Sequence, residues 1–212
     1  MSEPGASEQT LLTPRDILRA AGRRRISYEA FAAWHLEMMT NTVQLASRRI
    51  GVDIGRVLIR SDSDEPGRAG GASMFGPDFL QVPPVPDALL SLATLVRTTN
   101  AVHLISKCGP RLQQHTEQWL DAHEVYGSTG LPRHNLHFVR KRAEKGPVAS
   151  RLGLDTFVDD RLDVLVAMPP TVHTRILFGV QKLRTLPAWA IPALDWAAAL
   201  RALEPGDTAA QA

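Results

Sequence analysis

Short apolar runs alternate with longer amphipathic segments along most of this chain. The apolar runs predict buried strands at residues 50–54, 101–105, 136–139, 155–158 and 175–178. The amphipathic segments predict helices near residues 87–98, 110–124, 145–152, 161–168 and 193–203. Strands that alternate with helices are joined by right-handed crossovers, which place helices on both faces of a parallel sheet. The pattern therefore predicts an α/β fold, a Rossmann-like three-layer α/β/α domain with a parallel sheet, over residues 49–204.

The chain before the first predicted strand has a helical pattern only. The residues around Pro14 form a typical helix start, and a second helix is predicted over residues 28–47. We therefore expect an N-terminal helical extension over residues 11–48. Small and polar residues predict disordered tails at residues 1–10 and 205–212.

The composition is that of an ordinary globular protein. The 212 residues are 44% hydrophobic and 22% charged, so the chain can bury the core of one domain and differs from disordered or disulfide-rich chains. Its one cysteine cannot form an internal disulfide, and the N-terminus lacks the basic and apolar order of a signal peptide. We therefore expect a cytoplasmic protein. Because the net charge is only +2, we expect no nucleic-acid partner. Because no apolar run is long enough to cross a bilayer, we expect no membrane span.

Chemically distinctive residues stand where the predicted strands end. Asp53 follows the first strand, Ser106 follows the second, and the pair Asp159 and Asp160 follows a later one. Lys145 opens the helix that precedes this acidic pair. The carboxyl ends of parallel strands meet at one edge of the sheet, where ligands bind in this class of fold. We therefore expect a hydroxyl, an ammonium and three carboxylates to converge at that edge.

This set of side chains fits phosphoryl transfer. An aspartate carboxylate can attack phosphorus and so divide one difficult displacement into two easier ones. Magnesium held by carboxylates neutralises phosphate charge and reduces its repulsion of the nucleophile. A hydroxyl and an ammonium bind the equatorial oxygens of the phosphoryl group. The predicted substrate is therefore a phosphorylated small molecule or macromolecule.

The order of these motifs over residues 50–180 resembles the haloacid dehalogenase (HAD) superfamily of aspartate-nucleophile hydrolases, most of which are phosphatases. The four matching segments are residues 53–58, Ser106, Lys145 with Lys141 as the alternative, and Asp159 with Asp160. The resemblance implies that Asp53 is the nucleophile and that Ser106, Lys107 and Lys145 bind the phosphoryl group. It also implies a Mg²⁺ cofactor, with the ligands Asp53, the Gly55 carbonyl, Asp159 and Asp160.

The first motif departs from the pattern of the superfamily. Most of its phosphatases have a second aspartate two residues after the nucleophile, as general acid and base, but this chain has Gly55 there and Arg56 next. A glycine keeps the backbone carbonyl that binds the metal and lacks the proton shuttle, which is worth about 10²–10⁴-fold in rate. The acidic loop at residues 62–65 is a candidate replacement for that shuttle.

The segments between the motifs are short. The first motif is followed only by a Gly- and Pro-rich loop at residues 61–84. The segment from Ser106 to Lys145 holds little more than one helix and one strand. Neither segment has room for a full cap domain. The resemblance is therefore to capless or minimally capped members, whose open sites accept bulky substrates unless a partner subunit covers them. We therefore expect either a homodimer or a partner protein that binds through the N-terminal helices.

Two other interpretations remain open. Residues 51–55 also fit the start of the phosphate loop of actin-like sugar or acetate kinases, but Arg56 and Val57 replace the Gly-Thr of that loop. Gly55 also fits a catalytically weak or inactive relative that serves as a binding or scaffold protein. Joint binding of magnesium and a phosphate analogue would distinguish an active site from such a scaffold.

Overall fold

The computed structural model describes residues 33, 36, 39–40, 43–61, 72–182 and 185–204. The chain divides into two compact units, Met1–Met39 and Thr40–Ala212, and the second unit holds all the strands described below. Most of the predicted N-terminal extension, and both predicted tails, lie outside the described residues. Within the second unit, residues 43–47 are helical and lead into the first strand.

A six-stranded sheet forms the centre of the second unit, with the strand order β3-β2-β1-β4-β5-β6. Every neighbouring pair of strands is parallel, which confirms the predicted fold class. The strands are β1 (Arg49–Val52), β2 (Ala101–Lys107), β3 (Leu136–Val139), β4 (Thr156–Asp159), β5 (Thr174–Phe178) and β6 (Ala190–Ala193).

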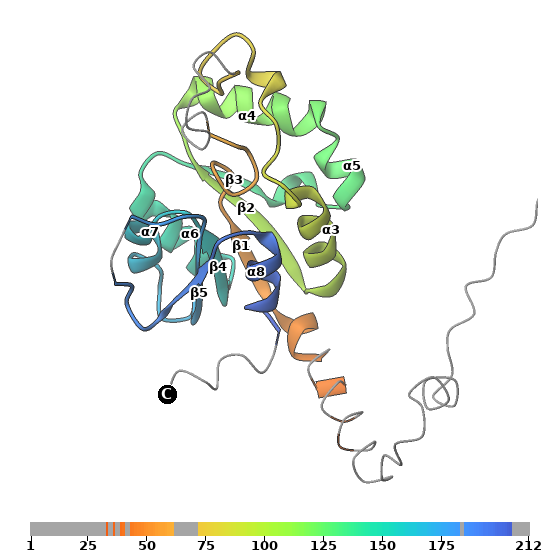
Figure 1. The fold of residues 1–212 in the computed structure, drawn as a ribbon, viewed down its shortest axis with the longest axis vertical. Helices are drawn as coiled ribbons and strands as arrows, with labels where there is room; N and C mark the ends of the chain where they lie inside the picture. The colour runs from red at the N-terminus through yellow and green to blue at the C-terminus, as the bar shows by residue number, and fades with distance from the viewer. Residues whose placement is uncertain are drawn as a thin grey trace, which may run out of the picture. The chain divides into compact units, whose positions relative to one another are not determined.

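Helices cover both faces of this sheet (Figure 1). The α-helices are α3 (Ala88–Thr98), α4 (Pro110–Ala122), α5 (Val125–Thr129), α6 (Lys145–Arg151), α7 (Leu162–Val166) and α8 (Trp196–Arg201), and the 3-10 helices are η2 (Phe79–Gln81), η3 (Arg133–Asn135) and η4 (Arg142–Glu144). Apolar side chains of α3, α4, α5 and α8 share one buried cluster with the sheet, and those of α6 and α7 share the other. The domain therefore has the predicted three layers.

One strand and one α-helix were not predicted from the sequence. β6 contains only four residues, and Pro192 lies among them, so its strand signal is weak. A proline is tolerated there because β6 is an edge strand that pairs only with β5. The helix predicted at residues 110–124 instead ends at Ala122, and α5 begins after Glu124, whose backbone is left-handed with φ of 52°.

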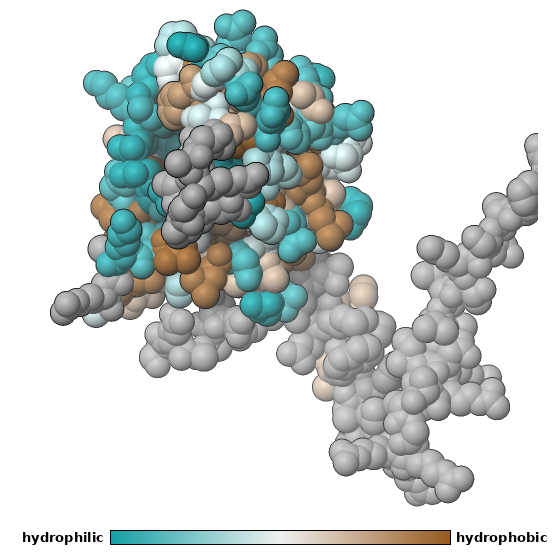
Figure 2. Space-filling model, turned by 45° about the horizontal axis from the view of Figure 1, so that its top comes forward, coloured by the Kyte–Doolittle hydropathy of each residue, from teal (hydrophilic) through white to brown (hydrophobic). Residues whose placement is uncertain are grey.

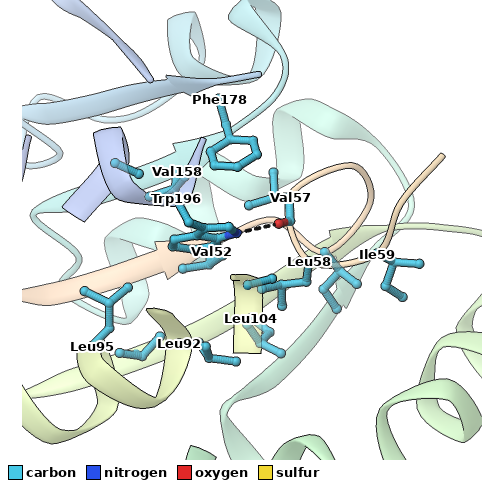
Figure 3. Close-up of a cluster of buried hydrophobic side chains, with 14 of the residues drawn as sticks. Val52, Val57, Leu58, Ile59, Leu92, Leu95, Leu104, Val158, Phe178 and Trp196 are labelled. Atoms are coloured by element: carbon cyan, nitrogen blue, oxygen red, sulfur yellow. Dashed lines mark hydrogen bonds between the residues drawn. The ribbon is translucent and has the colours of Figure 1, made fainter. Parts of the chain in front are cut away.

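Indole hydrogen bonds attach two helices to the loop that follows β1. The Trp196 Nε1–H of α8 donates to the Val57 carbonyl at 2.8 Å, inside the apolar cluster drawn in Figure 3. The Trp119 Nε1–H of α4 donates to the Val82 carbonyl at 2.7 Å. Both indoles are fully buried. The loop after β1 is thereby attached to the core at two points.

The strand order reverses between β1 and β4. The chain proceeds from β1 to β2 and β3 on one side, and from β4 to β5 and β6 on the other. Crossovers therefore diverge at this point, and a crevice at the carboxyl ends of β1 and β4 is the usual ligand site of an open α/β sheet. Within the described residues, the segment from β1 to α3 holds only η2, and that from β2 to β3 holds α4, α5 and η3.

No helix in the described part of the chain combines the length and apolar character needed to cross a bilayer. The face of the molecule drawn in Figure 2 is mostly hydrophilic, with apolar residues in smaller groups.

Candidate active site

Three carboxylates meet at the switch point between β1 and β4. Asp53 directly follows β1, and its backbone N–H donates to the Val158 carbonyl of β4 at 2.9 Å, which holds the two strand ends together. Asp159 is the last residue of β4, and Asp160 follows it. One oxygen from each of these three carboxylates lies within 4.8 Å of the other two. The structure thus brings together the acidic residues that the sequence placed at separate strand ends.

Lys145 lies between two of these carboxylates. Its Nζ is 2.8 Å from Oδ1 of Asp53 and 2.7 Å from Oδ2 of Asp159. The residue is only 1% exposed, although it is a lysine in the first turn of α6. Lys141, the alternative considered from the sequence, is exposed and does not line the cavity around Asp53. Of the two lysines, Lys145 is therefore the one whose ammonium reaches the carboxylates.

A close helix contact explains the position of Lys145. Gly146 follows it in α6, and a Cβ atom at that position would be 2.5 Å from the Ala167 carbonyl oxygen at the end of α7. Only glycine permits this approach without a shift of α6 or α7. The same carboxyl edge is fixed from the other side, because Oδ1 of Asp159 accepts the Arg161 N–H at 2.9 Å.

Burial and mutual repulsion shift the pKa values of these groups. Burial, followed by the Asp53 charge, raises the pKa of Asp159 to about 8 and that of Asp160 to about 6. Burial disfavours the charge on Lys145, but Asp53 and Asp159 outweigh it and raise the pKa of that ammonium. The ammonium of Lys145 therefore does not balance the charge of three carboxylates. A buried cluster of like charges resists full ionisation.

The donor set fits a hard divalent cation. Three carboxylates offer only oxygen ligands, which Mg²⁺ prefers, and their oxygens are close enough to share one ion. Two positive charges would also compensate the repulsion that raises the pKa values of Asp159 and Asp160. Gly55, the fourth expected ligand, lines the same cavity.

Asp53, Gly55, Lys145 and Asp160 line a cavity of about 650 Å³ at the carboxyl edge of the sheet, whereas Asp159 is fully buried and does not line it. Ser106 lines the cavity and is 8% exposed. It lies within β2, which continues two residues further than predicted, through Lys107. Lys107 also lines the cavity, with an exposed side chain. Cys108 is buried beside them, and burial raises the pKa of its thiol, so the thiolate is disfavoured.

The loop after Asp53 has an unusual backbone and a local opening. Arg56 has a φ of 64°, a left-handed conformation that costs about 1–2 kcal/mol for a residue with a Cβ atom. Its Nη1 lies 3.5 Å from Oδ2 of Asp160. Beside it, a Cβ atom at Gly55 would meet no atom within 4 Å. The place of the usual second aspartate is therefore open space next to a guanidinium.

One face of α4 forms a wall of the cavity that the sequence did not reveal. Arg111, Leu112, His115 and Thr116 line it, at the spacing of one helical face. His115 also holds the segment before η2, because its Nδ1–H donates to the Met74 carbonyl at 2.8 Å and its ring stacks on Phe79. Helical spacing from Arg111 to His115 was the available signal, but it also fits an ordinary solvated face. The acidic loop at residues 62–65 lies outside the described residues.

Comparison with known proteins finds similarity among solved structures only. No family model and no curated protein sequence matches the chain. Among solved structures, a haloacid dehalogenase-like family hydrolase from Xanthomonas campestris is similar, with 17% sequence identity and a TM-score of 0.49. The alignment covers 75% of this chain and 96% of that one.

Proposed function

We propose that this chain is a HAD-like hydrolase that cleaves phosphate monoesters through a covalent phosphoryl group on Asp53. The main support is the position of the Lys145 ammonium between Asp53 and Asp159. Asp160 belongs to the same carboxylate cluster. Oδ1 of Asp53 faces Lys145, and no hydrogen bond to Oδ2 occurs among the described residues. That second oxygen is available to attack phosphorus.

The proposed reaction has two displacements. Oδ2 of Asp53 attacks phosphorus, the bond from phosphorus to the ester oxygen breaks, and the leaving oxygen takes up a proton. Water then attacks the same phosphorus, inorganic phosphate departs, and the Asp53 carboxylate is restored. Ser106 and Lys145 bind the phosphoryl oxygens, and Lys145 also keeps Asp53 oriented. Mg²⁺, held by Asp53, Asp159, Asp160 and the Gly55 carbonyl, would neutralise the phosphate charge.

The lack of a carboxylate at Gly55 affects both proton transfers. A leaving group with a low pKa departs without a general acid, whereas an alkoxide does not, so aryl esters should react faster than alkyl esters. Water that attacks the phosphorylated Asp53 also lacks its usual base, so this intermediate should persist. The open space at Gly55 means that the Cβ atom of an added aspartate meets no atom within 4 Å.

A panel of phosphate monoesters, assayed with and without Mg²⁺, tests the proposal. Wild type should turn over aryl phosphates only with Mg²⁺, and Asp53→Asn should be inactive. Gly55→Asp should raise turnover by about tenfold or more, because a general acid and base contributes about 10²–10⁴-fold. Wild-type cleavage of alkyl and aryl phosphates at equal rates would contradict the assigned role of Gly55. Equal activity in Asp53→Asn would contradict the proposed nucleophile.

The second candidate function is that of a catalytically weak or inactive binding protein. The ion pair between Arg56 and Asp160 favours this second candidate. The Arg56 guanidinium already pairs with Asp160, a carboxylate that a metal ion would need as a ligand. Thermal unfolding with Mg²⁺, with vanadate and with both together separates the two candidates. An enzyme should show a larger shift with both ligands than the sum of the separate shifts.

The setting of the activity is also part of the proposal. The single cysteine favours a reducing compartment such as the cytoplasm. The substrate is a phosphorylated molecule that enters from the open edge of the sheet. A homodimer, or a partner bound through the N-terminal helices, would use a segment that lies mostly outside the described residues.

A further inference from the structure

Cationic side chains are concentrated around the cavity. The whole chain has 24 basic and 22 acidic residues. The cavity, in contrast, is lined by six basic residues besides Lys145 and by only two acidic ones among the described residues. The six are Arg56, Arg60, Lys107, Arg111, Arg142 and Arg161. Charge of one sign in a cleft raises the local concentration of ligands of the opposite sign.

Most of these cations already have protein partners. Arg56 pairs with Asp160 at 3.5 Å, and Arg161 and Arg142 share Asp163 at 3.0 and 4.0 Å. No ion pair or side-chain hydrogen bond involves Lys107 or Arg111 within the described residues. Both side chains are exposed and both line the cavity. These two positive charges are therefore available to a ligand.

Arg111 also occupies a position that costs folding free energy. It is the second residue of α4, whose first turn contains no acidic residue and whose cap at Gly109 makes no side-chain hydrogen bond. A cation in the first turn of a helix is repelled by the helix dipole, at a cost of about 0.3–1 kcal/mol. An anion bound to Arg111 would be attracted by the N-terminal end of the helix dipole and would offset the repulsion of Arg111.

The proposed reaction does not need these charges. Lys145 and Mg²⁺ would neutralise the transferred phosphoryl group at the buried end of the cavity. Lys107, which the superfamily resemblance implied as a further ligand of that group, instead has an exposed side chain at the cavity wall, as does Arg111. Building on the proposed function, we propose that the substrate is a small molecule with two phosphate groups, and that Lys107 and Arg111 bind the phosphate that is not transferred. A cavity of about 650 Å³ has the size of a small-molecule site.

Nonhydrolysable ligands test this subsite without any turnover. The probes are alkane α,ω-bisphosphonates of three to five carbons and the matching alkyl monophosphonates, measured by calorimetry at constant free Mg²⁺. Wild type should bind the best bisphosphonate about tenfold or more tightly than its monophosphonate, because a charge-assisted hydrogen bond contributes about 1.5–3 kcal/mol. Arg111→Gln should remove most of that preference and change monophosphonate affinity by less than about twofold. Arg97→Gln, which removes an exposed arginine at the end of α3 outside the cavity, should leave the preference intact.

The outcome is independent of whether the proposed hydrolysis occurs. Equal affinities for the two ligand classes in wild type would overturn the subsite, as would equal losses for both classes in Arg111→Gln. Tighter binding of an acidic phosphopeptide than of any bisphosphonate would replace the small molecule by a protein substrate. If the preference holds in Asp53→Asn but no phosphate ester is hydrolysed by wild type, the subsite stands and the proposed function fails.

Discussion

At the residue scale, the site depends on an ammonium buried between two carboxylates. Lys145 is 1% exposed and Asp159 is fully buried, so neither charge has water as an alternative partner. Removal of one member of such a pair leaves an uncompensated buried charge, which is far more costly than the net contribution of the intact pair. Lys145 is therefore predicted to stabilise the fold as well as to bind phosphate.

We predict that Lys145→Ala lowers the free energy of unfolding of the metal-free protein by about 3–5 kcal/mol. Asp53 and Asp159 would then repel each other without a nearby cation. Urea unfolding at neutral pH measures the loss, and added Mg²⁺ should reduce it. Lys141→Ala is the matched control, and this exposed lysine should change stability by less than about 0.5 kcal/mol. Equal effects of the two substitutions would contradict the assignment of Lys145.

Arg56 presents a second prediction at this scale. Its guanidinium lies 3.5 Å from Asp160, so it competes with a cation for that carboxylate. We predict that Arg56→Gly raises Mg²⁺ affinity by about threefold to tenfold, because a positive charge near the ligand is removed. Glycine also accepts the left-handed backbone at this position. Arg56→Lys keeps the charge and should show a much smaller increase by calorimetry. Weaker Mg²⁺ binding in Arg56→Gly would mean that Arg56 orients Asp160 for the metal.

At the scale of elements, the strands and helices that face the core were readable from the sequence, and those without a strong apolar pattern were not. β1, β2 and β4 are continuous buried runs, and their ends gave the positions of Asp53 and Ser106 to within a residue or two. β6 escaped because a four-residue edge strand with a proline has no distinctive pattern. α5 escaped because its five residues, with Gly127 among them, are too few to show a helical apolar pattern.

Two neighbouring strands also carry a pH-sensitive contact. Nδ1 of His103 on β2 lies 3.1 Å from Nε2 of His137 on β3, and Nε2 of His103 is buried with no partner in the described structure. Burial, then the His137 charge, lowers the pKa of His103 to about 4. Burial followed by the Arg151 charge lowers that of His137. Arg49 and His134 add positive potential around His103, and both rings are therefore neutral at neutral pH.

This contact predicts a loss of stability in mild acid. Between pH 6.5 and about 4 the unfolded chain binds a proton at His103 that the folded chain does not, so the contribution of His103 to the free energy of unfolding falls as the pH falls through this window. Above pH 6.5 both states are neutral, and the effect vanishes. Chemical denaturation of wild type and His103→Leu from pH 7 to 4.5 measures the difference in slope. The variant should lose less stability over this range, and identical slopes would rule out His103 as the source.

At the scale of the whole molecule, the sequence predicted the residues at the carboxyl ends of the strands but not the walls of the cavity. Asp53, Ser106 and Asp159 were predictable because the carboxyl ends of parallel strands lie at one edge of the sheet, independently of the loop conformations. The walls include Arg111 and His115 of α4 and Arg142 of η4, two segments that are separate in the sequence. Their proximity depends on where α4 and η4 pack, and each residue alone has the pattern of a solvated surface. The cationic character of the cavity is therefore a property of the fold.

The central claim is that Asp53 carries a phosphoryl group during turnover. Wild type mixed with an aryl phosphate and Mg²⁺, then quenched in acid within the first turnovers, should contain protein heavier by one phosphoryl group. Peptide mapping by mass spectrometry should place that group on Asp53, and it should be absent from Asp53→Asn and from samples without Mg²⁺. Because Gly55 supplies no base for the second step, the phosphorylated fraction should be large and should decrease in Gly55→Asp. Hydrolysis of the ester with no phosphoryl group on Asp53 at any quench time, or with the group on another residue, would contradict the account.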